Sequence, residues 1–362
     1  NSFNENALTI GFARRFATYK RGNLLFRDME RLSAIVNNSE RPVQFVFAGK
    51  AHPNDGAGQE LIKSIVQYSK LPQFLGKIIF LENYDMSLAK KLVSGVDIWL
   101  NTPTRPLEAS GTSGMKAVMN GCLHFSVLDG WWVEGYKEKA GWALDQKQTY
   151  ENDDFQNELD AANIYHLIEN DIVNAFYNRD ANGVPNEWVS FIKNSIANIA
   201  PEFTMKRMLD DYKERFYGKL TKRSNELKDQ NFKLAKEIAS WKKKVARSWD
   251  SISIEKINFF DVVKEPLYMG EKYYGEIIVD LNELWGIDIG VEMVIFEIDK
   301  KNKTEKIIDI KDLDLMKTVG QKNHYAIELV PIKPGNFNYG FRVYPKNDKL
   351  PHRQDFSYLK WL

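Results

Sequence analysis

Apolar strands that alternate with amphipathic helices constrain the first 130 residues of this chain more than any other feature. The pattern predicts buried strands at 7–12, 43–48, 77–81, 96–100 and 122–127, and helices near 22–36, 57–69, 87–94 and 113–120. Strands that are joined through helices run parallel to one another. The alternation therefore predicts an α/β fold, with a Rossmann-like doubly wound parallel sheet.

Polar segments follow four of these strands at the point where each strand ends. They occupy residues 14–21, 49–52, 82–84 and 108–116. The carboxyl ends of parallel strands open on one edge of the sheet, where ligands bind. We therefore expect these four segments to line one crevice.

The segment 106–117, Pro-Leu-Glu-Ala-Ser-Gly-Thr-Ser-Gly-Met-Lys-Ala, combines glycines, hydroxyls, a carboxylate and a lysine. Gly111 permits a positive φ, and the N–H groups at the start of the following helix suit an anion such as phosphate. Lys116 falls inside that helix, where its amine is able to form a Schiff base with a carbonyl compound. The alternative is an ordinary glycine-rich loop that precedes a helix, with Lys116 in solvent.

The turn after the first strand is basic, because it carries Arg14, Arg15, Lys20 and Arg21. Four cations beside a strand end suit a doubly charged phosphate, and a solvated basic turn is the alternative. No GxGxxG follows the first strand and no GxxxxGK[ST] loop is present. These absences disfavour a nicotinamide dinucleotide site and a P-loop.

The remainder of the chain divides by pattern into a helical and a strand-rich part. We expect three domains: a Rossmann-like domain at 1–150, a helical segment at 151–250 that completes and bridges it, and an antiparallel β-sandwich at 251–362. Short strands without intervening helices are typical of a sandwich. In the sandwich, Tyr273, Tyr274 and Trp285 are candidates for a sugar-stacking platform, although packing in the core is the favoured role.

Composition excludes several classes of function. A net charge of +1 gives no general attraction to nucleic acid, and no apolar run is long enough to cross a membrane. The single cysteine, Cys122, rules out an internal disulfide and indicates a reducing compartment, so we expect a cytoplasmic protein. No spacing typical of metal ligands is present. The chain begins at Asn1 without a methionine, which suggests part of a longer polypeptide.

The motifs together resemble one family. Residues 108–116 resemble the pyridoxal-phosphate lysine segment of the α-glucan phosphorylases, which include the glycogen, starch and maltodextrin phosphorylases, and residues 14–21 resemble their basic phosphate-binding segment. Residues 49–51, 82–84 and 128–134 match further family segments in the same order. The resemblance covers residues 1–220 and does not extend to the sandwich.

The resemblance implies a role for each matching residue. Lys116 would hold pyridoxal 5′-phosphate as a Schiff base. The cofactor would also be bound by Arg14, Lys20, Lys50, Tyr84, Gly111 and Thr112. Arg15 and Lys20 would bind phosphate groups and, with Lys116, form the catalytic set, while Glu108, Ser110 and Gly111 would contact the transferred glucose.

In this family the cofactor's phosphate, rather than its ring, takes part in proton transfer. It passes a proton to inorganic phosphate, which protonates the glycosidic oxygen as the bond breaks. The resemblance thus implies phosphorolysis of an α-1,4-glucan to α-glucose 1-phosphate with retention of configuration. It implies no metal.

Family enzymes have a GT-B architecture, with the site between two Rossmann-like domains. This chain shows one such domain, so we expect it to be the C-terminal part, inactive when isolated, with the N-terminal half of the same enzyme as partner and a homo-oligomer possible. The Thr-Ser-Gly-Met-Lys sequence at 112–116, Asp85 and the Trp131–Trp132 pair depart from the glycogen enzymes. They indicate a divergent, bacterial-type branch. The alternatives are a nucleotide-sugar glucosyltransferase of the glycogen synthase type and a non-catalytic glycan-binding module.

Overall fold

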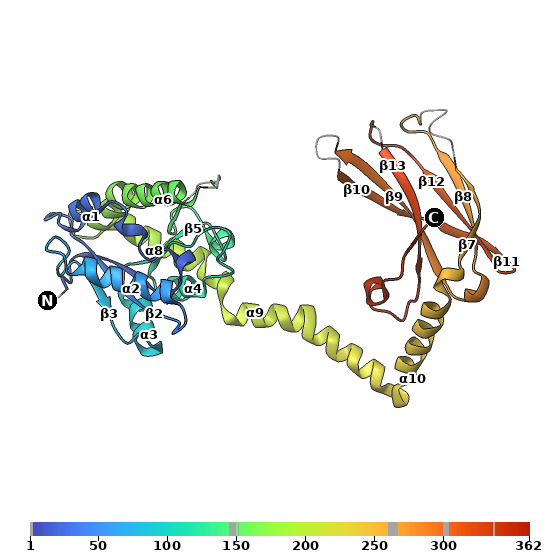
Figure 1. The fold of residues 1–362 in the computed structure, drawn as a ribbon, viewed down its shortest axis with the longest axis horizontal. Coiled ribbons are helices and arrows are strands. Elements are labelled where there is room, and N and C mark those ends of the chain that lie inside the picture. Colours follow the sequence, from blue (N-terminus) through green and yellow to red (C-terminus); the bar gives the residue numbers. More distant parts are fainter. Residues whose placement is uncertain (1–2, 145–149, 151, 260–266, 300–303, 336) are drawn as a thin grey trace. The chain divides into compact units, whose positions relative to one another are not determined.

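The structure is a computed structural model that describes residues 3–144, 150, 152–259, 267–299, 304–335 and 337–362. The chain forms two compact units, Asn1–Arg215 and Phe216–Leu362 (Figure 1). The division between them falls inside the predicted helical segment 151–250. The three-domain division remains a prediction, because compactness does not show which parts fold independently.

A six-stranded sheet with all neighbours parallel forms the centre of the first unit. Its strand order is β3-β2-β1-β4-β5-β6, which is the order of a doubly wound Rossmann sheet. The strands are β1 Leu8–Phe16, β2 Val43–Ala51, β3 Ile78–Leu81, β4 Ile98–Asn101, β5 Leu123–Val127 and β6 Trp142–Leu144. The predicted fold class is confirmed. The sequence pattern missed β6, which has only three residues.

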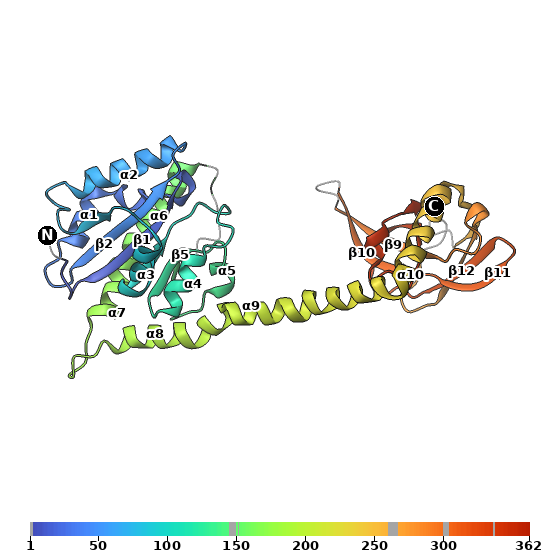
Figure 2. The ribbon, with the colours of Figure 1, turned by 90° about the horizontal axis from the view of Figure 1, so that it is seen from below.

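Helices cover both faces of this sheet (Figure 2). One face packs against α1, α2, α6 and α7, and the other packs against α3 and α4. The helices of the unit are α1 Met29–Val36, α2 Gly56–Ser69, α3 Met86–Gly95, α4 Thr112–Met119, α5 Trp132–Gly135, α6 Asp153–Leu167, α7 Val173–Tyr177, α8 Asn186–Asn198 and α9 Met205–Tyr212. Both faces of the central strands are buried, which explains why these strands are almost continuously apolar.

Aspartates fix the starts of three helices. The carboxylates of Asp28, Asp55 and Asp85 accept hydrogen bonds from backbone N–H groups in the first turns of α1, α2 and α3. An N-cap carboxylate satisfies an amide that has no partner within the helix and favours the positive end of the helix dipole. Asp85, one of the departures from the glycogen enzymes, therefore has a local structural explanation.

The strand order reverses between β1 and β4. From β1 the chain proceeds outward through β2 and β3, and it then returns to β4 on the other side of β1. Helices on opposite faces diverge at such a point and leave a crevice at the carboxyl ends of the two strands. The basic segment 14–21 and the Ser/Gly segment after β4 both lie there, as the sequence predicts. Strand β1 is longer than the predicted strand 7–12, so Arg14 and Arg15 are at its end and not in the turn.

The second unit contains a bent helix and a β-sandwich. Helix α10, Gly218–Ser248, is interrupted by non-helical backbone at 229–232. The two antiparallel sheets have the orders β10-β9-β13-β14 and β11-β12-β8-β7, and this confirms the predicted sandwich. The strands are β7 Ser253–Asn258, β8 Tyr273–Asp280, β9 Ile289–Asp299, β10 Thr304–Asp312, β11 Asp314–Val319, β12 Lys322–Leu329, β13 Phe337–Pro345 and β14 Lys360–Trp361.

Two of the three aromatic residues considered as a sugar platform are exposed. Tyr274 has 67% of its surface exposed and Trp285 has 59%, whereas Tyr273 packs against the core of the sandwich. The preference for core packing was therefore wrong for Tyr274 and Trp285. The two residues lie at opposite ends of the segment 273–285, which contains the whole of β8, so they do not form one platform.

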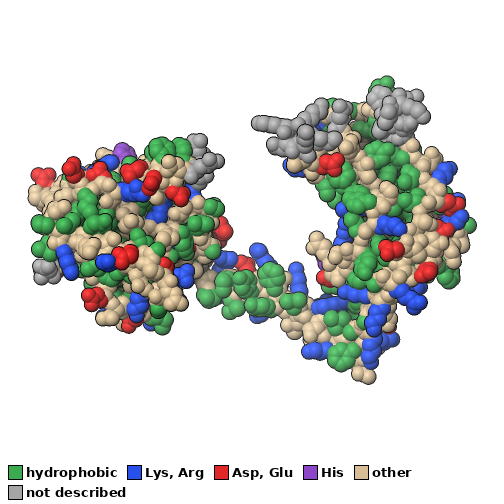
Figure 3. All heavy atoms as spheres, in the orientation of Figure 1, with side chains coloured by type: hydrophobic (Ala, Val, Ile, Leu, Met, Phe, Trp, Pro, Cys, Tyr) green, Lys and Arg blue, Asp and Glu red, His purple; other side chains and the backbone are tan. Residues whose placement is uncertain are grey.

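Hydrophobic side chains are exposed along the helical segment 205–220 (Figure 3). In the first unit they are Met205, Leu209 and Tyr212, which recur every three to four residues and so lie on one side of α9. In the second unit they are Phe216, Tyr217 and Leu220. Exposed apolar faces of this kind mark surfaces that another part of a protein covers. Among the described helices, none has the length and hydrophobicity that crossing a bilayer requires.

Candidate active site

The segments that follow β1 and β4 are joined by direct hydrogen bonds. The Thr104 backbone N–H donates to the Tyr19 carbonyl oxygen at 2.7 Å, and the Thr102 hydroxyl donates to the Lys20 carbonyl oxygen at 3.2 Å. These bonds hold the basic segment against the loop that leads to Glu108. The predicted convergence of these two segments therefore occurs.

The centre of this junction is an ion-pair cluster of Arg14, Lys20 and Glu108. Arg14 Nη2 lies 2.6 Å from Glu108 Oε2, and Lys20 Nζ lies 2.5 Å from the same oxygen. All three side chains are less than 10% exposed. Burial alone would raise the pKa of Glu108, but the hydrogen bond from Lys20 and the charge of Arg14 outweigh it, so the pKa lies below its usual value.

Some N–H groups of Arg14 have no hydrogen-bond acceptor among the described residues. Its Nε and Nη1 atoms are buried and have no hydrogen-bond partner among the described residues. Burial lowers the pKa of Arg14, and Glu108 only partly offsets this effect. Buried N–H groups without acceptors are costly. An anion with several acceptor oxygens, such as a phosphate group, would satisfy them.

The Ser/Gly segment forms the start of α4. Gly111 has a left-handed backbone, with φ of 81°, and α4 begins at the next residue, Thr112. Ser110 is half-buried, and its carbonyl oxygen accepts a hydrogen bond from the Trp131 backbone N–H at 2.8 Å. Lys116 is exposed on α4, one turn after the helix begins, so its amine is accessible. The loop thus places amide donors and an accessible amine on one short helix.

Asp129, which has no predicted role, anchors the same loop. Its Oδ2 accepts from the Glu108 backbone N–H at 2.9 Å, and its Oδ1 accepts from the Gly130 backbone N–H at 2.9 Å. The carboxylate therefore fixes the backbone position of Glu108. The Asp-Gly pair after β5 was the available signal, because this dipeptide is typical of a tight turn at a strand end.

Arg21 is bonded to the loop after β4 and to α6 rather than to Glu108. Its guanidinium donates to the carbonyl oxygens of Thr102 at 2.8 Å and Pro103 at 3.0 Å, and it lies 2.6 Å from Asp160 of α6. Both ionic side chains are buried. Arg21 therefore ties the loop after β4 to α6, and its hydrogen-bonding capacity is used within the protein.

The structure does not bring every predicted residue to the cluster. Side chains alternate along a strand, so Arg15 faces away from Arg14; it is exposed, and no hydrogen bond or ion pair to another described side chain is formed. Lys50 of β2 is in register with Arg15 and is also exposed. The charge of Arg14 acts on the hydroxyl of Tyr84. Burial raises the pKa of Tyr84, and the positive charge of Arg14 partly offsets this rise.

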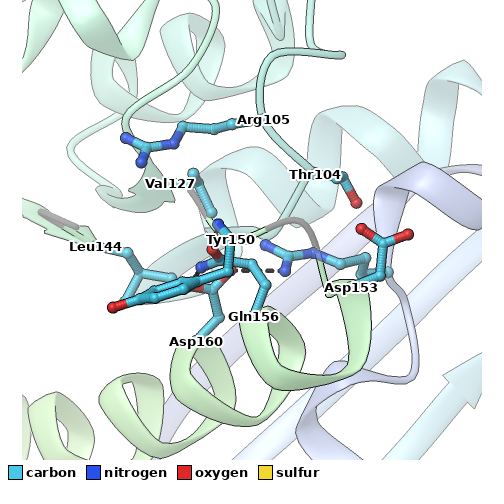
Figure 4. Close-up of a pocket in the computed structure, with 9 residues that line it drawn as sticks. Thr104, Arg105, Val127, Leu144, Tyr150, Asp153, Gln156 and Asp160 are labelled. Carbon is cyan, nitrogen blue, oxygen red and sulfur yellow. Dashed lines mark hydrogen bonds and ion pairs between the residues drawn. The ribbon is translucent and has the colours of Figure 1, made fainter. Parts of the chain in front are cut away.

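A small pocket lies at the carboxyl ends of β5 and β6 (Figure 4). Arg105 lies on one side of it, and Asp153 and Gln156 of α6 lie on the other. Its remaining lining residues are Arg21, Thr104, Val127, Leu144, Tyr150 and Asp160. Of the residues that the sequence predicts to bind phosphate, cofactor or substrate, only Arg21 is among the described residues that line this pocket.

His124 lies beneath the start of α4. It is fully buried on β5, its Nδ1 lies 3.2 Å from the Trp99 carbonyl oxygen, and a Cβ at Gly114 would lie 2.7 Å from its Nε2. Residue 114 must therefore be a glycine for α4 to approach β5 this closely. Burial lowers the pKa of His124 to about 3, so the imidazole is neutral at physiological pH.

We expect the first unit to lose stability as the pH falls from 6.5, the ordinary pKa of histidine, toward about 3. Over this range the unfolded histidine binds a proton that the folded state excludes, at a cost of up to about 1.4 kcal/mol per pH unit. Above pH 6.5 the histidine is neutral in both the folded and the unfolded state, so the stability of the first unit is not lowered by His124. Urea unfolding of His124→Gln should depend less on pH between 6 and 4 than unfolding of the unaltered chain, and equal slopes would contradict the assignment.

Two protein-family models match the chain. The model described as Carbohydrate phosphorylase matches residues 3–144, which include the ion-pair cluster and α4. The model described as Glycogen phosphorylase C-terminal domain matches residues 249–362, which include the sandwich. This chain belongs to the α-glucan phosphorylase family. The predicted family is thus confirmed, and the second match extends it to the sandwich, which the sequence motifs did not reach.

Named relatives agree with this assignment. The chain is 43% identical over 362 residues to the maltodextrin phosphorylase of Thermococcus litoralis, an alignment that covers 99% of the chain and 42% of the relative. It is 53% identical over 217 residues to the glycogen phosphorylase of Aquifex aeolicus, covering 60% of the chain and 31% of the relative. The glycogen phosphorylase of Mycobacterium tuberculosis is 34% identical over 352 residues, an alignment that covers 96% of the chain and 40% of the relative. The chain therefore spans less than half the length of these α-glucan phosphorylases.

Proposed function

We propose that this chain supplies the cofactor- and phosphate-binding side of an α-glucan phosphorylase. The reaction would be phosphorolysis of an α-1,4-glucan by inorganic phosphate, which gives α-glucose 1-phosphate with retained configuration. The observation that carries the proposal is the buried cluster of Arg14, Lys20 and Glu108 beside the start of α4. Phosphorolysis requires dense positive charge and N–H donors around phosphate, and this junction provides both.

The residues of the junction fit pyridoxal 5′-phosphate. The unpaired buried N–H groups of Arg14 and the amides at Gly111 and Thr112 would hold its phosphate, and the exposed amine of Lys116 is free to attach its aldehyde. Tyr84 and Lys50 would lie near the cofactor. When bound, the cofactor supplies a phosphate that exchanges protons with the substrate phosphate.

The protein's own groups would position the substrates. Lys20, together with Arg15, would bind inorganic phosphate, since Lys20 is a compact cation with several donors. Glu108 would accept hydrogen bonds from hydroxyls of the transferred glucose, and Ser110 and Gly111 would contact the same sugar. Asp129 would hold Glu108 in place through the backbone bond described above. Stabilisation of charge where the glycosidic bond breaks would thus come from Lys20, which the fold holds beside this loop before the substrates bind.

We infer that activity also requires the N-terminal half found in enzymes of this architecture. Two observations support this: the chain spans 42% of the Thermococcus relative, and helix α9 of the first unit exposes an apolar face that another part of the enzyme could cover. The 362 residues alone should therefore turn over little glucan. Assembly of the complete enzyme into a homo-oligomer is compatible with this proposal.

The choice of glucosyl donor tests the proposed function. The complete enzyme containing this chain should elongate maltodextrin with glucose 1-phosphate and release inorganic phosphate, and it should do neither with UDP-glucose or ADP-glucose. The family match and the accessible Lys116 favour this outcome over the glycogen synthase alternative. Elongation from a nucleotide sugar would contradict the proposal, and glucan binding without transfer from any donor would favour a non-catalytic glycan-binding module.

A further inference from the structure

We propose that Glu108 occupies phosphate-binding cations before phosphate arrives and releases them when phosphate binds. Glu108 would then control phosphate affinity and couple phosphate binding to sugar binding. The inference rests on the proposed function, in which Lys20 binds inorganic phosphate and the unpaired N–H groups of Arg14 hold the cofactor's phosphate. It adds that Arg14 Nη2, which contacts Glu108, also donates to inorganic phosphate. It adds a role for Glu108 that precedes its contact with sugar.

The contacts of Glu108 are those of a local counter-ion. A single oxygen, Oε2, accepts from Arg14 Nη2 at 2.6 Å and from Lys20 Nζ at 2.5 Å. The three side chains are 9%, 7% and 7% exposed, so solvent screens them poorly. Two buried cations this close would repel each other without an anion between them. The carboxylate therefore keeps the cationic site assembled in the absence of phosphate.

Phosphate and the carboxylate compete for the same donors. Both are anions with oxygen acceptors, and phosphate carries the larger charge. If phosphate oxygens accept from Lys20 Nζ and Arg14 Nη2, the adjacent carboxylate is repelled and loses its partners. The Glu108 backbone stays fixed because its N–H donates to Asp129. Only the side chain needs to rotate.

The exchange has a consequence for sugar binding. In the described structure the cations hold Oε2, whereas a displaced carboxylate would have both oxygens available to accept sugar hydroxyls. Phosphate binding would thus create the acceptor that the glucose unit requires. Phosphate and glucan should bind with positive coupling, and by linkage each should increase the affinity for the other.

Titration of the 362-residue chain with inorganic phosphate in a calorimeter tests the proposal. Glu108→Gln preserves the size of the side chain but removes the competing charge, so its phosphate Kd should fall about tenfold. Glu134→Gln, which removes an exposed carboxylate from α5, is the matched control and should not change the Kd. In a chain that also carries Lys20→Met, Glu108→Gln should increase phosphate affinity by less, because the cation for which Glu108 and phosphate compete is absent.

A merely structural role for Glu108 would predict weaker phosphate binding after substitution, not tighter binding. An unchanged or weaker Kd for Glu108→Gln, with measurable binding by the unaltered chain, overturns the exchange and leaves the proposed phosphate site intact. Absence of binding in both proteins contradicts the phosphate site itself. If Glu108→Gln does not fold, Glu108→Asp decides the question: it keeps the charge but shortens the reach to the cations, so its phosphate Kd should also fall, and an unchanged Kd would overturn the proposal.

Discussion

Replacing Lys116 by arginine should abolish reductive labelling of the chain by pyridoxal phosphate at limiting reagent. The unaltered chain, treated with pyridoxal phosphate and then borohydride, should carry the label on the peptide that contains Lys116. Arginine keeps the positive charge but has no primary amine that attacks an aldehyde at neutral pH. In the complete enzyme, the same substitution should lower phosphorolysis by roughly a thousandfold or more, because the cofactor would lose its covalent attachment.

The labelling shows a specific cofactor site only if pyridoxal phosphate reacts with Lys116 in preference to other exposed lysines. Lys90, an exposed lysine on α3, provides the control, and Lys90→Arg should leave the labelling of Lys116 unchanged. Inorganic phosphate should compete with the label, since the cations of the cluster would attract the phosphate of pyridoxal phosphate. Two outcomes would contradict Lys116 as the cofactor lysine. One is a label distributed among surface lysines. The other is a label on Lys116 whose amount does not decrease when inorganic phosphate is added.

The arrangement of the fold was predictable because local pattern and topology agree in this chain. Buried parallel strands leave long apolar runs, and each helix between them has one apolar face. Elements whose form depends on distant contacts were not predictable in this way. Strand β6 has three residues, and β14 consists of two residues that pair with β13. Such short strands carry no periodicity and exist only because a neighbouring strand is present.

The site was predictable to the level of segments but not to the level of individual charges. The sequence indicated that the basic turn and the Ser/Gly loop meet, because both follow strands on either side of the reversal in strand order. It did not distinguish among the four cations of the turn. Strand alternation separates Arg14 from Arg15, and the backbone turn directs Arg21 toward α6, where Asp160 lies 2.6 Å away. The partners that distinguish Lys20 from Arg21 lie more than 80 residues away along the sequence.

Arg21 is consequently the cation whose loss should most destabilise the fold. Arg21→Ala should lower the free energy of unfolding of the first unit by about 3–5 kcal/mol, because Asp160 would remain buried without its counter-charge. The carbonyl oxygens of Thr102 and Pro103 would also lose their donors. Thermal unfolding of this unit should shift downward by about 10 °C. Arg21→Lys should recover only part of the loss, because an ammonium cannot reach all the acceptors of a planar guanidinium.

Arg27 offers a matched control on the same side of the unit. It also pairs with acidic residues of α6, Asp154 and Glu158, but the carboxylates are 83% and 59% exposed. Solvent screens such pairs, so Arg27→Ala should cost less than about 1 kcal/mol. Similar losses for the two arginines would show that Arg21 is not held in a buried pair. A large loss for Arg21 alone would show that this cation of the basic segment 14–21 acts within the protein. Arg21 fixes the loop after β4, from which Glu108 reaches Lys20.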